Sequence, residues 1–159
     1  MKRQIKFRAK AIHDDEWVYG LPIHYNRDSR YEKWMMYDES GLGTDIDEET
    51  LCQFTGLHDM HGTEIYEGDI LRVKEYGNEL MKVFSDDPDR FDMFTLEEIK
   101  AECIAEYVSP VVWDEGGFLI SSNGDYYDMW CASLFGDMRR SSPIFEFEVV
   151  GDIYNKNKE

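Results

Sequence analysis

The sequence predicts a mainly β protein. Three observations lead to this class: short segments alternate polar and apolar side chains, other segments concentrate aromatic and branched residues, and Gly-containing turns separate them. The chain has 159 residues, of which 42% are hydrophobic and 14% aromatic. This composition supplies a core, and the length suits one domain or two small interlocked ones.

Residues 1–54 are expected to form an N-terminal antiparallel sheet. Four strands are predicted, at residues 4–9, 17–25, 33–37 and 50–54. In the first strand, Ile5, Phe7 and Ala9 fall on one face because side chains alternate along an extended chain. A small sheet of this kind is only marginally stable alone, so it is expected to pack on residues 55–159.

Residues 55–159 are expected to form the second subdomain. Its predicted strands are residues 69–74, a hairpin of 108–113 with 118–120, and a strand pair around Gly151. Gly62 and Gly68 are expected to take positive φ in the turns that lead into the first of these strands. Residues 126–138 fit either a short helix or a strand.

An acidic helical insertion is predicted at about residues 94–107. Thr95 and Glu98 have the spacing of a capping box. The apolar residues of the segment then fall on one helical face: Leu96, Ile99, Cys103, Ile104 and Tyr107.

Charge narrows the classes of partner. The formal net charge is −17, which opposes docking on a phosphate backbone, so direct nucleic-acid binding is not expected. Basic residues are concentrated at residues 2–10 and acidic residues at 38–50. Both segments could be solvated surface, or the basic segment could contact an acidic one within the chain or across a subunit interface. No apolar run has the length of a membrane helix and no signal core follows the first residues, so a cytoplasmic location without membrane contact is expected.

Two groups of residues have types suited to chemistry. Cys52, His58 and His61 are possible transition-metal ligands, but a fourth ligand is not evident and a surface turn, with Asp59 as its cap, explains the histidines. The run from His13 to Asp15 offers an imidazole and two carboxylates, yet it sits at a predicted hairpin tip. Nucleophile elbows, phosphate loops and dinucleotide fingerprints are absent from the sequence.

The remaining candidates also have structural explanations. The three cysteines are widely spaced without a CxxC pair, so buried free thiols are expected. Aromatic side chains could stack nucleic-acid bases, but core packing is the expectation for those in strand patterns: Trp17, Tyr19, Trp34, Trp113 and Phe118. The sequence therefore predicts no catalytic residue, no cofactor and no metal site.

One stretch carries a family resemblance. TGLHDMHGTEIYEGDILRV, residues 55–73, resembles the signature of the YopX family of phage and prophage proteins. The likeness extends to further blocks: IKFRA at 5–9, VYG at 18–20, VVWDEGGF at 111–118 and EVVGDIY at 148–154. The resemblance implies a mainly β protein whose second part is an SH3-like barrel. Such barrels often begin with a Gly-Asp pair that enters the first strand, and Gly68 and Asp69 have this arrangement. The resemblance implies no activity and no site residues.

The chain departs from the family pattern in three places. Lys10 stands where an aromatic residue is common, and His58 and His61 stand where Lys and Asn are usual. The acidic segment of about residues 84–107 is long for a connection between barrel strands. The changed histidine positions weigh further against a metal site.

The expected function is that of a non-enzymatic phage or prophage accessory protein. It would bind another protein or assemble with itself, with the basic strand at residues 2–10 as a candidate contact along an open edge. A first alternative is a nucleic-acid mimic, whose carboxylates at 38–50 and 86–106 would occupy a basic groove of a host protein. A second alternative is a metal-dependent enzyme.

Overall fold

The computed structural model describes residues 5–26, 32–76, 103–114, 117–122, 125–129 and 144–155. These residues are mainly β, as predicted, and their strands pair in antiparallel fashion. The chain divides into two compact units. The N-terminal unit comprises Met1–Gly56 with Glu64–Glu67, and the C-terminal unit comprises Leu57–Thr63 with Gly68–Glu159. Within the described ranges, no helix is long and apolar enough to cross a membrane.

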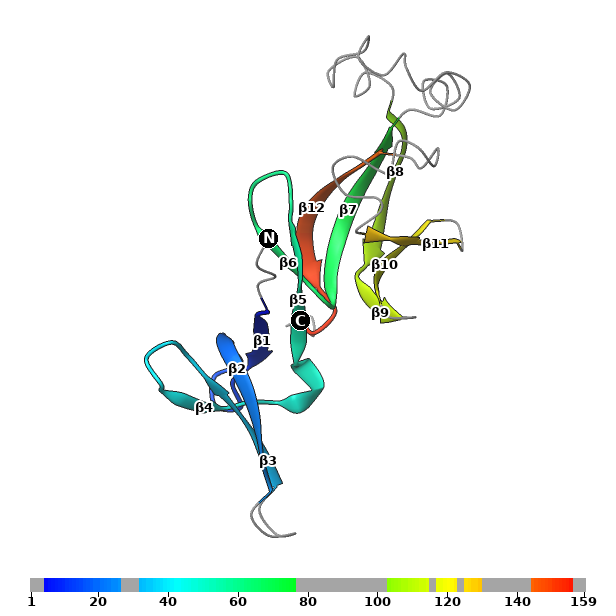
Figure 1. Cartoon of the computed structure of the whole chain (residues 1–159). Helices are drawn as coiled ribbons and strands as arrows, with labels where there is room; N and C mark the ends of the chain where they lie inside the picture. The colour runs from blue at the N-terminus through cyan, green and yellow to red at the C-terminus, as the bar shows by residue number, and fades with distance from the viewer. Residues whose placement is uncertain are drawn as a thin grey trace. The chain divides into compact units, whose positions relative to one another are not determined.

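The N-terminal unit is built on a six-stranded sheet of order β4-β3-β2-β1-β5-β6 (Figure 1). Its strands are β1 (Phe7–Lys10), β2 (Trp17–Asn26), β3 (Glu32–Tyr37), β4 (Gly43–Asp45), β5 (Cys52–His58) and β6 (Glu64–Tyr66). A 3-10 helix, η1 (Glu48–Thr50), precedes β5. Strand β2 changes partner along its length, since Trp17 to Gly20 pair with β1 and Leu21 to Asn26 pair with β3.

One face of this sheet carries the core of the N-terminal unit. Ala9, Met36 and Ile46 are fully buried there. Four partly buried side chains pack against them: Phe7, Val18, Trp34 and Leu51. Because cross-strand partners share a face, the pairs Ala9 with Val18 and Arg8 with Tyr19 lie on opposite faces of the sheet. Arg8 and Tyr19 therefore belong to the face away from this core.

Gly20 stands at the point where β2 changes partner. A Cβ atom on this residue would lie 2.0 Å from the carbonyl oxygen of Tyr37, closer than any real contact. No side chain fits, so glycine is required for β2 and β3 to approach this closely.

The C-terminal unit holds two three-stranded sheets of order β12-β7-β8 and β11-β10-β9. Their strands are β7 (Asp69–Tyr76), β8 (Cys103–Pro110), β9 (Val112–Asp114), β10 (Gly117–Ser122), β11 (Asp125–Asp128) and β12 (Ile144–Asp152). The backbone N–H of Ser121 in β10 donates to Ser109 Oγ in β8 at 2.9 Å, which joins the two sheets.

The turn after β5 attaches to the edge of β12. Asp59 Oδ1 accepts from the N–H groups of His61 at 2.9 Å and Thr63 at 2.8 Å, and Oδ2 accepts from Val149 at 3.1 Å. Gly62 and Gly68 have φ of 84° and 78°, which confirms the positive φ predicted for both. Asp59 is thus a turn cap, and it also holds the turn on β12.

Two predictions for the C-terminal unit differ from the structure in the residues that it describes. The helix predicted for about residues 94–107 is a strand where it is described, because Cys103–Pro110 pairs along β7 as β8. Burial there alternates from Ala105 to Pro110, the pattern of a strand, so pairing with β7 overrides the local helical signal. Residues 94–102 lie outside the described residues. The strand pair expected around Gly151 is one strand, β12, with a bulge between Val149 and Gly151.

The SH3-like barrel expected for residues 55–159 is not seen as a closed barrel. In the part of the chain that the structure describes, the strands of the C-terminal unit form open sheets. A barrel closes only when its first and last strands pair, and no such pairing joins these strands.

Candidate functional site

A pocket of about 680 Å³ opens on the N-terminal unit. Apolar side chains form much of its lining: Ile5, Phe7, Tyr19, Leu21, Tyr37 and Tyr66. Three of them are exposed, with exposed fractions of 59% for Ile5, 52% for Tyr19 and 61% for Leu21. The polar lining consists of Lys6, Asp38, Glu39, Ser40 and Glu64, so a hollow with exposed apolar walls and charged ends results. We call this surface the pocket face.

An ionic and aromatic network forms one end of the pocket face. The Lys6 ammonium donates to Glu64 Oε1, and the Tyr66 hydroxyl donates to Glu64 Oε2 at 2.7 Å. The Tyr66 ring is buried and lies 5.5 Å from the Phe54 ring and 6.0 Å from the Tyr19 ring, between centroids. Burial and the hydrogen bond to Glu64 raise the pKa of Tyr66, so its hydroxyl stays protonated and remains a donor.

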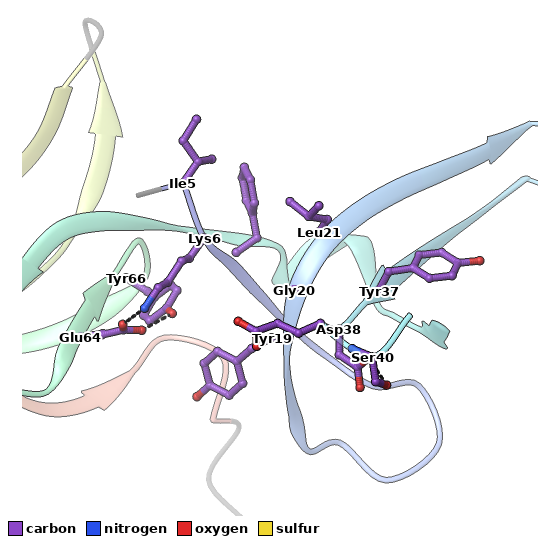
Figure 2. Close-up of a pocket in the computed structure, with 12 residues that line it drawn as sticks. Ile5, Lys6, Tyr19, Gly20, Leu21, Tyr37, Asp38, Ser40, Glu64 and Tyr66 are labelled. Carbon is purple, nitrogen blue, oxygen red and sulfur yellow. Dashed lines mark hydrogen bonds and ion pairs between the residues drawn. The ribbon is translucent and has the colours of Figure 1, made fainter. Parts of the chain in front are cut away.

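The turn between β3 and β4 forms the other end. Asp38 Oδ1 accepts three hydrogen bonds, from Ser40 N at 2.8 Å, Ser40 Oγ at 2.6 Å and Leu42 N at 3.0 Å. The bond from the Ser40 side chain, with those from the backbone, lowers the pKa of Asp38 and keeps it ionised. Figure 2 shows Lys6, Glu64 and Tyr66 grouped at one end of the pocket, and Tyr37, Asp38 and Ser40 at the other.

Tyr37 belongs to the second end and has its own support. Its hydroxyl lies 2.9 Å from the Tyr25 hydroxyl, across the β2 and β3 pair. This hydrogen bond is the main cause that raises the pKa of Tyr37. The ring is therefore a neutral, fixed aromatic wall at ordinary pH.

The basic residues of β1 are engaged inside the N-terminal unit. The guanidinium of Arg8 lies 4.2 Å from the Trp17 ring centroid and 4.6 Å from the Tyr66 ring centroid. Lys10 Nζ lies 3.2 Å from Asp15 Oδ2. Strand β1 is interior, between β2 and β5, so the expectation that the basic strand offers an open edge is wrong for Phe7–Lys10. Residues 2–4 lie outside the described residues.

The structure separates the possible metal ligands. Cys52 is buried at the start of β5, where its thiol donates to the Thr50 carbonyl at 3.1 Å. His58 ends the same strand, which places it about 20 Å from Cys52 at the rise of an extended chain. His61 Nε2 lies 4.0 Å from Glu148 Oε1. Among the described residues, no group of three or more His, Cys, Asp or Glu side chains is placed to hold a metal ion.

The run from His13 to Asp15 forms an exposed turn. Asp14 Oδ1 accepts from the Glu16 N–H at 3.2 Å, and Asp15 pairs with Lys10. Asp15 has a φ of 63°, which short polar side chains tolerate in turns. These contacts give the two carboxylates structural roles at the tip of the β1 and β2 hairpin.

Two aromatic residues expected in the core are exposed instead. Tyr19 lies on the pocket face, and Trp113 in β9 is 47% exposed. Phe118 is buried, as expected, and its ring meets Trp113 edge-on with centroids 4.7 Å apart. Sequence reasoning missed the pocket face. The alternation of side chains along a strand shows that residues 19, 21 and 23 share one face of the sheet, but it does not show which face is covered by other residues.

The family model described as YopX protein matches residues 6–158, nearly the whole chain. No curated protein matches the chain.

Proposed function

Because the chain belongs to the YopX family, whose description names no activity, we propose its role from its own surfaces. It is a non-enzymatic phage or prophage accessory protein that binds another protein through the pocket face. One observation carries the proposal: exposed apolar side chains adjoin a hollow large enough to receive a partner's side chains.

The composition of the pocket face supports a protein partner. Single exposed apolar residues are common on any protein, whereas a group of them around a hollow marks an interaction site. Ile5, Tyr19 and Leu21 form such a group, and Tyr residues are well suited to protein interfaces. Charged groups at both ends supply the polar rim that such interfaces have.

Charge opposes nucleic acid as the partner. The formal net charge is −17. The described basic residues nearest the pocket, Lys6 and Arg8, are held by Glu64 and by aromatic rings. A phosphate backbone would meet Asp38, Glu39 and Glu64, which it repels.

The same charge favours a different protein over a second copy of this chain. Two molecules of −17 repel each other, and the repulsion grows as salt is removed. Self-assembly, in which the partner is a second copy of this chain, is the other form of the proposal. Light scattering coupled to gel filtration tests it, since a sharp monomer at high protein concentration, both at low salt and at a salt concentration that screens the repulsion, rejects it.

The nucleic-acid mimic is the alternative from another class. It needs carboxylates that are free to imitate phosphates, but several in residues 38–50 have structural partners. Asp38 caps its turn, Asp45 pairs with Lys33 at 2.8 Å, and Asp47 caps η1. The alternative predicts salt-sensitive capture of basic host proteins through the acidic segments, with no effect of changes on the pocket face. A metal-dependent enzyme is the third possibility, which elemental analysis for bound metal tests.

A matched pair of variants tests the proposal. Leu21 on the pocket face and Val108 in β8 are each 61% exposed and lie in strands of different units. The tagged wild-type chain, Leu21→Asp and Val108→Asp are used to capture proteins from a lysate of the bacterium that carries the gene. Burial of most of a leucine contributes about 1–2 kcal/mol, so Leu21→Asp is expected to weaken capture about tenfold or more.

The control defines what contradicts the proposal. Val108→Asp makes the same change in charge on another surface and is expected to retain the same proteins as wild type. Equal loss with both variants, or full retention with Leu21→Asp, would reject the pocket face as the binding surface.

A further inference from the structure

We infer that the pocket face receives an arginine side chain of the partner protein. The inference rests on the proposed function and names the chemistry of the group that would enter the pocket. It follows from three features: a fixed carboxylate at one end, aromatic and aliphatic walls, and an internal ammonium that already occupies the other end.

The fixed carboxylate is Asp38. Three hydrogen bonds to Oδ1 hold its side chain in one position before any partner arrives. A charged group that is already ordered loses little conformational entropy on binding, so it binds a cation better than a mobile surface acid. Glu39, its neighbour in the turn, adds a second negative charge to the same end of the pocket.

The walls suit the rest of an arginine side chain. Leu21 and Ile5 offer aliphatic surface to its methylene stem, and Tyr19 and Tyr37 offer aromatic rings to the planar guanidinium. Arg8 shows that this unit already holds a guanidinium in that way, between two aromatic rings on the same face of the sheet. An ammonium from lysine could not stack in this manner, so the geometry favours arginine.

Charge balance gives the pocket its preference for a cation. Three carboxylates line it, from Asp38, Glu39 and Glu64, against the one ammonium of Lys6, which leaves a formal charge of −2. The Lys6 and Glu64 side chains are 40% and 30% exposed, so their ion pair is reachable by a competing cation. Removal of the Lys6 charge would change the formal charge of the pocket lining from −2 to −3 and strengthen the attraction for a cation.

The test is an NMR titration of the whole chain with N-acetyl-arginine amide, with the citrulline analogue as a neutral isostere. A probe of this size is expected to bind with a dissociation constant on the order of millimolar. It should shift the backbone amides of Gly20, Leu21 and Ser40, and citrulline should shift them much less. Equal shifts with both probes, or shifts centred elsewhere, would overturn the inference.

Charge variants make the test specific. Glu39→Gln and Asp38→Asn are expected to weaken the arginine probe several-fold, whereas Lys6→Gln should strengthen it several-fold. Asp47→Asn removes one negative charge outside this pocket and should leave binding within about twofold of wild type. Glu39 is included because Asp38→Asn also alters its turn. The inference fails if Lys6→Gln weakens binding or if Asp47→Asn acts as strongly as Glu39→Gln.

The two proposals fail in different ways. If Leu21→Asp abolishes capture of the partner but the arginine probe does not bind, the surface is right and the inferred side chain is wrong. If Leu21→Asp leaves capture intact, the proposed function itself is wrong.

Discussion

Asp59→Asn is the substitution with the most clearly defined effect on the fold. The wild-type carboxylate accepts from the N–H groups of His61, Thr63 and Val149, and the side chain is almost fully buried. Asparagine keeps one oxygen for the turn but turns an amide NH₂ toward the Val149 N–H, so a donor meets a donor. The turn should therefore lose its hold on β12.

The magnitude follows from the three bonds. A hydrogen bond to a charged acceptor contributes about 1 kcal/mol more than one to a neutral acceptor, and the two turn bonds each lose this difference. Loss of the Val149 bond adds a further ~1 kcal/mol, reduced where water reaches the freed groups. We expect the free energy of unfolding to fall by about 2–3 kcal/mol, or roughly 5–10 °C in Tm.

Urea unfolding followed by circular dichroism measures this change, and amide hydrogen exchange at Val149 locates it. Asp14→Asn is the control, because Asp14 accepts a 3.2 Å hydrogen bond from the Glu16 N–H in an exposed turn. Loss of this bond should change the free energy of unfolding by less than about 0.5 kcal/mol. Equal stability of the two variants, or unchanged exchange at Val149, would refute the role given to Asp59.

The pH dependence of Asp59 has a defined sign. Burial raises the pKa of this carboxyl, but the hydrogen bonds from Thr63, Val149 and His61 outweigh it and the pKa lies below its ordinary value. The stability that the carboxylate contributes is therefore complete above the unfolded pKa of about 3.9 and is lost as the pH falls through the lower folded value. The gap between wild type and Asp59→Asn should narrow in acid.

Three further substitutions test the N-terminal unit. Arg8→Lys should lower stability by about 1–2 kcal/mol in urea unfolding, because an ammonium cannot stack between Trp17 and Tyr66 as the guanidinium does; an unchanged midpoint contradicts this. Gly20→Ala places a Cβ 2.0 Å from a backbone oxygen of β3, so a loss of about 2 kcal/mol or more is expected, with faster amide exchange in the hairpin. Tyr66→Phe removes the hydroxyl whose pKa is raised by burial and by Glu64. Alkaline absorbance titration should then lose a transition that lies above the ordinary range of tyrosine, and loss of a transition near pH 10 would show that Tyr66 is an ordinary phenol.

Much of the fold could be predicted from local patterns. The alternation in β1 and the aromatic and branched runs of β2 and β3 are properties of a few neighbouring residues, and these strands form where expected. The turn role of Asp59 and the positive φ of Gly62 and Gly68 also depend on local chemistry, so they could be predicted from sequence.

The missed elements depend on distant partners. Strands β4 and β6 have three residues each, too few for a periodic pattern, and pairing with their neighbours creates them. The capping-box spacing of Thr95 and Glu98 predicted a helix that runs to residue 107, but Ala105 to Pro110 pair with β7, 30 to 40 residues earlier in the chain. Local propensity gives no account of such pairing.

The candidate site was hidden for the same reason. Lys6 and Glu64 are 58 residues apart, so their ion pair cannot be seen in the sequence. Tyr19 and Leu21 look like core residues by type, and only their exposure in the folded chain, 52% and 61%, shows that they lie on an open surface. The sequence indicated the strand that carries these residues but not the surface that they form.

The most direct test of the account is amide hydrogen exchange of the chain with its captured partner, compared with the chain alone. The account predicts slower exchange in the complex at the segments that line the pocket face, residues 5–7, 19–21 and 37–40. Protection confined to the C-terminal unit, for example around Val108 and Trp113, with no change at the pocket face, would contradict it.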